Sequence, residues 1–140
     1  MIYLEYDDLL CAIRQEQLDV LLDGMDWTLE KVELACIKEM KKYLRERYEV
    51  ETIFLKENRD AYVIQQLVDL VIFQLCKKYA PDEIPAHREK NRNEVIENLE
   101  KAADGFVIED YPLKVNEEGE VKPSIVSGSM HPKQNFRDFF

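Results

Sequence analysis

Residues 59–81 read RDAYVIQQLVDLVIFQLCKKYAP. Apolar residues recur in this stretch mostly at steps of three and four, the spacing of one face of an α-helix. They are Ala61, Ile64, Leu67, Val68, Val71, Ile72, Leu75 and Cys76. Leu70 and Phe73 widen that face, as in a helix that is covered on several sides. Because Pro81 disfavours helix at the residue before it, the pattern predicts a central helix over residues 59–79.

A long helix is predicted on each side of this one. The first begins at Trp27-Thr28, with Thr28 as its N-cap, and continues towards Tyr48. The other begins at Pro85, which suits the first turn of a helix, and ends at Gly105. Residues 86–94 of this helix are almost all polar, which indicates either an overhang into solvent or a surface for a neighbouring chain.

Shorter elements complete the predicted helical body. Asp7 or Asp8 is expected to cap a helix that runs to Gly24 and breaks or bends near residues 15–17. Residues 50–58 form a connector with β-branched and aromatic members that we expect to fold back over the helices.

The pattern changes after Gly105. Residues 106–140 hold two of the four glycines and three of the five prolines, and their apolar residues no longer follow a helical period. An extended segment, a turn at 116–119 and a return strand at 121–126 predict a hairpin-like arm. The fold class is therefore mainly α, a small helical bundle of residues 1–105 with a C-terminal β-hairpin-like arm and flexible tail.

Aromatic residues at the end of the arm are expected to anchor it on a partner. The candidate contact residues there are Met130, Phe136, Phe139 and Phe140.

Composition bounds the function. The chain has 140 residues and a net charge of −10, and no segment is a basic block, which disfavours tight binding to nucleic-acid phosphates. Its apolar runs are far shorter than the roughly 20 residues of a membrane span, and its first residues lack a secretion signal. These features predict a cytoplasmic protein without membrane contact.

Metal and redox chemistry are not expected. The three cysteines lack CxxC spacing and lie among apolar residues, so we expect them to be buried thiols. The chain has two histidines. No catalytic group, cofactor or metal site is predicted, and the protein is expected not to be an enzyme.

Several motifs together resemble one family. Residues 42–48, KYLRERY, contain a Tyr-Leu-x-x-Arg-Tyr arrangement, and residues 3–9 contain Tyr-x-x-x-Asp-Asp-Leu before a leucine-rich stretch. An apolar helix around Leu67 and Leu75 follows, and then a helix from Pro85 that closes in Leu-x-x-Ala-x-x-Gly at residues 99–105. In order and spacing, residues 3–105 resemble the Mu-like phage and prophage head–tail joining proteins, a connector (adaptor) family long described as a domain of unknown function.

The resemblance implies a structural role. Members of such a family are expected to form a homo-oligomeric ring between the portal protein and the tail or stopper proteins, through which DNA passes without specific binding. The chain would assemble in the host bacterial cytoplasm and remain in the virion, and the isolated protein could be monomeric. Besides the terminal aromatic residues, the interface candidates are Tyr43, Arg45, Arg47, Tyr48, Arg88 and Arg92.

Two other functions stay open. A cytoplasmic helical binding or regulatory module would also suit a helical body with an ordering tail, and it predicts a dimer or heteromer instead of a ring. Glu30-x-x-Glu33 followed by Glu57-x-x-Asp60 matches, in spacing, the carboxylate pairs of all-α nucleoside triphosphate pyrophosphohydrolases. Such pairs could hold Mg²⁺.

Overall fold

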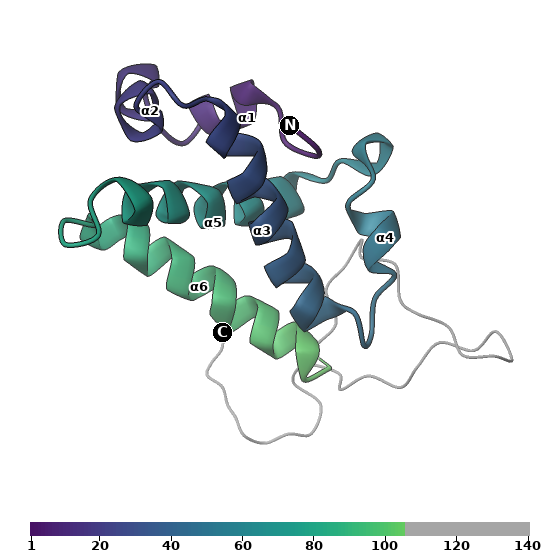
Figure 1. The fold of residues 1–140 in the computed structure, drawn as a ribbon. Coiled ribbons are helices and arrows are strands. Elements are labelled where there is room, and N and C mark those ends of the chain that lie inside the picture. The colour runs from purple at the N-terminus through teal and green to yellow at the C-terminus, as the bar shows by residue number, and fades with distance from the viewer. Residues whose placement is uncertain (106–140) are drawn as a thin grey trace, which may run out of the picture.

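The computed structural model describes residues 1–105, which fold into six α-helices and one 3₁₀ turn (Figure 1). The elements, in chain order, are α1 (Tyr6–Leu10), α2 (Gln15–Leu22), α3 (Trp27–Leu44), α4 (Val50–Ile53), η1 (Lys56–Asn58), α5 (Ala61–Tyr79) and α6 (Ala86–Ala103). The prediction of a mainly helical body with three long helices behind short N-terminal ones is confirmed. The expected hairpin-like arm and tail at 106–140 lie outside the described residues.

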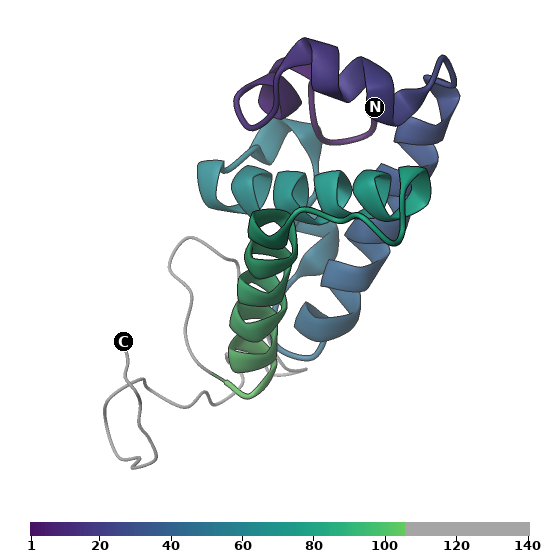
Figure 2. The same ribbon diagram turned by 90° about the vertical axis from the view of Figure 1, so that its left-hand side faces the viewer.

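Helix α5 is the centre of the body. It lies between α1 and α2 on one side and α6 on the other, and α3 crosses it (Figures 1 and 2). Asp60 caps its N-terminus, since its Oδ2 accepts from the backbone N–H groups of Tyr62 (3.0 Å) and Val63 (3.2 Å). Nine of its residues are buried, which agrees with the wide apolar face of the sequence.

Helix α3 begins one residue before the predicted cap. Asp26 is the N-cap residue, and the prediction of Thr28 in that role is wrong. The buried Thr28 hydroxyl instead donates to the carbonyl oxygen of Met25, 2.8 Å away. A Thr hydroxyl within a helix can donate to the carbonyl oxygen three residues earlier. Thr28 therefore lies inside the first turn of α3 and does not cap it.

A buried carboxylate attaches the N-terminal segment to α3. The Glu33 side chain is fully buried, and its two oxygens accept from the backbone N–H groups of three successive residues. The bonds are 2.7 Å to Ile2, 2.9 Å to Tyr3 and 2.7 Å to Leu4. Because buried charge is costly unless it is hydrogen-bonded, Glu33 defines the path of the first residues.

Tyr3 and Arg59 join this segment to the start of α5. The Tyr3 hydroxyl accepts from the backbone N–H of Asp60 at 3.0 Å, and its ring meets Phe54 edge-on with centroids 5.6 Å apart. The Arg59 guanidinium pairs with Asp8 and, at 3.5 Å, with Glu5. Asp8 also accepts from the backbone N–H of Glu5, so it caps α1 from inside the first turn.

The break between the first two helices comes earlier than expected. Residues 11–14 separate α1 from α2, and Gln15 starts α2 instead of interrupting a helix. Helix α2 ends at Leu22, just before the predicted stop at Gly24; its C-cap residue Asp23 (φ 50°) and Gly24 (φ 75°) both adopt left-handed backbone. Cys11, in the break, is exposed, so the expectation of three buried cysteines is wrong for this one.

The connector and the last helix follow the sequence more closely. Ile53 and Phe54, from residues 50–58, are buried against the helices. Helix α6 buries Val95, Leu99 and Ala102 in its second half. No residue of its first half is fully buried.

We expect Glu33→Ala to lower the free energy of unfolding by about 3–5 kcal/mol, because it leaves three N–H groups near the core without an acceptor. Urea denaturation measures the change. Lys38→Ala, at an exposed position of the same helix, is the control and should cost about 0.5 kcal/mol or less. Equal losses for the two variants would contradict the anchoring role of Glu33.

Candidate functional site

The Tyr-Leu-x-x-Arg-Tyr motif lies where α3 ends against α6. The Arg47 Nε donates to the carbonyl oxygen of Ala103 at 3.2 Å, which ties the end of α3 to the end of α6. Tyr48 is buried, at 2% exposure, and belongs to the core. Tyr43 is half-buried beneath the Lys42 ammonium, which lies 5.0 Å from its ring centroid.

Arg45, in contrast, is exposed, and both it and Arg47 lie just beyond the last residue of α3. Arg47 is half-buried and faces α6, while Arg45 lies on the surface. Of the four candidates in this motif, Arg45 is the one with an exposed side chain.

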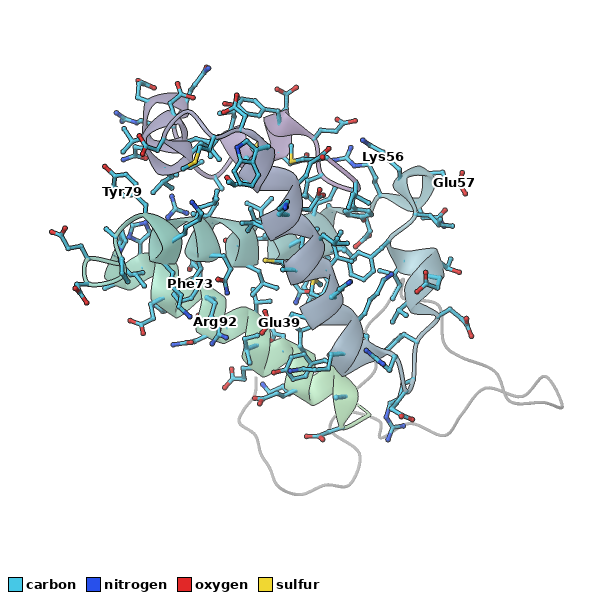
Figure 3. The ribbon with its side chains drawn as sticks, in the orientation of Figure 1. Glu39, Lys56, Glu57, Phe73, Tyr79 and Arg92 are labelled. Atoms are coloured by element: carbon cyan, nitrogen blue, oxygen red, sulfur yellow. The ribbon has the colours of Figure 1, made fainter. Side chains whose placement is uncertain are left out.

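Arg92 joins the three long helices. Its guanidinium lies over the ring of Phe73 of α5, 5.5 Å from the centroid, and its Nη2 is 3.8 Å from Oε2 of Glu39 of α3 (Figure 3). Its Nε is buried and has no hydrogen-bond partner among residues 1–105. Burial against an aromatic face gives this arginine a packing role within the body.

Arg88 lies at the edge of a pocket and spans it. Its Nη2 donates to the carbonyl oxygen of Ala12, 3.0 Å away, and so connects α6 to the turn between α1 and α2. Nearby on α5, burial raises the pKa of the half-buried Asp69, while the charge of Arg88 opposes that shift.

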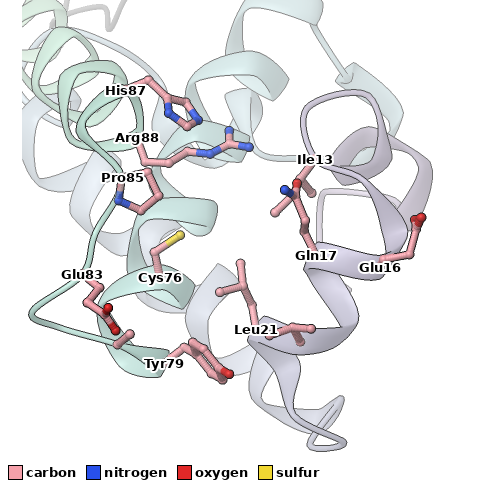
Figure 4. Close-up of a pocket in the computed structure, with 12 residues that line it drawn as sticks. Ile13, Glu16, Gln17, Leu21, Cys76, Tyr79, Glu83, Pro85, His87 and Arg88 are labelled. Carbon is pink, nitrogen blue, oxygen red and sulfur yellow. The ribbon is translucent and has the colours of Figure 1, made fainter.

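The pocket has a volume of about 510 Å³ and lies between α2 and the junction of α5 and α6 (Figure 4). Leu21 of α2 and Cys76 of α5 face each other across it. Volumes of about 300–1,000 Å³ are typical of pockets that bind a small-molecule ligand. The sequence did not predict this pocket, since its walls come from segments about 60 residues apart.

The four carboxylates of the pyrophosphohydrolase pattern have different surroundings. Glu33 is buried with its oxygens occupied by backbone N–H groups, and Asp60 caps α5. Glu57, on the exposed turn η1, points away from the body (Figure 3). Within residues 1–105 no three His, Cys, Asp or Glu side chains lie close enough together to hold a metal ion.

Glu33 could have been recognised from its spacing. It falls in the same register as the buried Leu29, Cys36, Ile37 and Met40, a pattern that places a carboxylate on the core side of α3. A carboxylate at such a position needs donors from elsewhere in the fold, and residues 2–4 supply them.

The remaining candidates, Met130, Phe136, Phe139 and Phe140, lie outside the described residues. Across residues 1–105, none of the helices has both the length and the apolar character needed to span a membrane. Comparisons of the chain with protein families, with curated proteins and with solved structures gave no match.

We expect Arg47→Met to lower the free energy of unfolding by about 1 kcal/mol, because it removes a charged donor from a partly buried carbonyl oxygen. Arg14→Met, at an exposed position before α2, is the control and should change it by about 0.5 kcal/mol or less. Chemical denaturation of both variants measures this difference. An equal or larger loss for Arg14→Met would contradict the assignment of Arg47 to the fold.

The cysteines should differ in reactivity. Burial, helped by the charges of Glu39 and Glu33, raises the pKa of the Cys36 thiol to about 12. The thiol therefore keeps its proton below that pH, and at pH 8 only about one in 10,000 is the reactive thiolate. Alkylation at pH 8, mapped by mass spectrometry, should modify the exposed Cys11 and leave Cys36 unmodified until urea unfolds the protein. Equal rates in the folded protein would contradict this placement of Cys36.

Proposed function

We propose that this protein is a structural subunit of a phage head–tail connector. It would assemble as a ring between the portal protein and the tail or stopper proteins and let DNA pass. The proposal extends the resemblance of residues 3–105 to the Mu-like head–tail joining proteins.

The observation behind the proposal is that the motifs of that resemblance meet in one helical body. Tyr3, from the first motif, contacts the start of α5. Arg47, from the second, bonds to the last turn of α6. Arg88, near the start of the last motif, bonds back to residue 12. Each motif taken alone has little specificity for the family. Tertiary contacts between the motifs are expected if the chain shares the family's fold, and these contacts are present.

The first half of α6 is the surface we assign to a neighbouring subunit. Glu89, Lys90, Asn93 and Glu94 are exposed there, and both signs of charge are present. Mixed charges of this kind favour a specific polar contact between copies. In a ring each subunit uses two different surfaces, so the partner of this face lies elsewhere on the next subunit.

The net charge of −10 suits a channel for DNA. A protein that neutralises many phosphates binds DNA tightly, whereas an acidic lining repels the backbone and lets it slide. On this proposal the protein has no catalytic role, and its activity is to join other chains.

We expect a chain ending at Val126 to lose partner binding, because the removed residues hold Met130, Phe136, Phe139 and Phe140. Size-exclusion chromatography with light scattering would follow the full chain and the shortened chain, each alone and with the portal protein of the same phage or prophage. The full chain should form a complex with the portal protein, and the shortened chain should not.

A second variant separates the aromatic contacts from the loss of chain length. The triple substitution of Phe136, Phe139 and Phe140 by Ala keeps all 140 residues and should also lose the complex. A stable dimer that does not bind the portal protein, and whose oligomeric state the truncation leaves unchanged, would overturn the proposal and favour a regulatory module.

A further inference from the structure

The pocket between α2 and the α5–α6 junction is apolar inside, and its edge carries charged side chains of both signs. Ile13, Leu21 and Cys76 supply apolar walls. Burial raises the pKa of the Cys76 thiol, so it lines the pocket as a neutral group. The carboxylates of Glu16 and Glu83 are exposed at the margin.

Two large apolar side chains beside this pocket are exposed to solvent. Val20 is 52% exposed and Tyr79 is 51% exposed, and they lie on opposite walls, one on α2 and one at the end of α5. Exposed apolar groups beside a hollow are typical of a docking site. A ligand that covered both would bury apolar area on each side of the pocket.

We infer that this pocket binds the C-terminal aromatic segment of the chain itself, residues 133–140. The segment reads KQNFRDFF and supplies three phenylalanines, the kind of side chain that fills an apolar pocket. Its two basic residues, Lys133 and Arg137, complement Glu16 and Glu83 at the margin, and its one acidic residue, Asp138, complements Arg88.

The residues between Gly105 and the aromatic segment are numerous enough for the segment to reach the pocket. Helix α6, at about 1.5 Å per residue, separates the pocket from Gly105 by roughly 27 Å. Roughly 30 residues lie between Gly105 and Phe136, and an extended chain spans up to about 100 Å over that length.

The tether favours the chain's own segment over that of a second copy. A segment linked in this way has an effective concentration of order millimolar, far above a protein solution at about 10 μM. In the isolated chain we therefore place the segment in its own pocket. In this respect the inference rests on the proposed function, because the segment would leave the pocket to contact the portal protein or the next ring.

A photo-crosslinker tests the contact in the full chain. With p-benzoylphenylalanine at position 139 and the protein at about 10 μM, irradiation should form adducts within residues 13–21 or 76–88, which mass spectrometry can map. The adducts should have the mass of one chain.

Val20→Asp should lower the adduct yield about tenfold or more, because it places a charge on an apolar wall. Tyr79→Ser should also lower the adduct yield, because it removes an aromatic ring from the opposite wall. Leu34→Asp is the matched control, since Leu34 is 41% exposed on α3 and does not line the pocket. Circular dichroism checks that each variant keeps its helices.

The inference would be overturned by adducts that map to other residues or that form only between two chains. It would also be overturned if Val20→Asp left the adduct yield unchanged. The portal-binding measurement stands apart from this one. A complex with the portal protein but no adduct in the pocket would refute the docking alone. Adducts in the pocket without portal binding would refute the connector function and leave the docking in place.

Discussion

The Glu33 carboxylate is the interaction on which the N-terminal half of the body depends. It is fully buried, and three successive backbone N–H groups from residues 2–4 donate to it. Once those residues lie along α3, the Tyr3 ring reaches Phe54 and its hydroxyl reaches the start of α5. A buried charge is tolerated here because its oxygens are satisfied, and the same need for donors excludes other paths for the segment.

Arginines complete the frame around α5. Arg59 pairs with Asp8 and Glu5 beside α1, Arg88 reaches the turn before α2, and Arg47 reaches the end of α6. Each of these arginines contacts an element distant from its own in sequence. Arg47 and Arg88 do so by donating to backbone carbonyl oxygens near helix ends. The apolar face of α5 supplies the burial, while the arginines help to set how the ends of the helices meet it.

Predicting from sequence worked best where the signal is local. The wide apolar face of α5, its stop before Pro81 and the glycine at the end of α2 follow from spacing and backbone preference. The predicted start of α3 was less accurate, because the Thr28 hydroxyl bonds to the carbonyl oxygen of Met25 inside the first turn instead of capping the helix. The sequence also proposed arginines and tyrosines as one interface group without separating those that serve the core.

By itself the sequence determined the helical class, the central place of α5 and the polar first half of α6, since helix periodicity is read within a few turns. Only the tertiary structure decided that Glu33 is a buried anchor, that Arg47 bonds to the end of α6 and that Arg88 crosses a pocket. Those outcomes depend on residues 31, 56 and 76 positions apart, as in the contacts of Glu33, Arg47 and Arg88. Contacts at that separation form only when helices pack, so no local pattern records them.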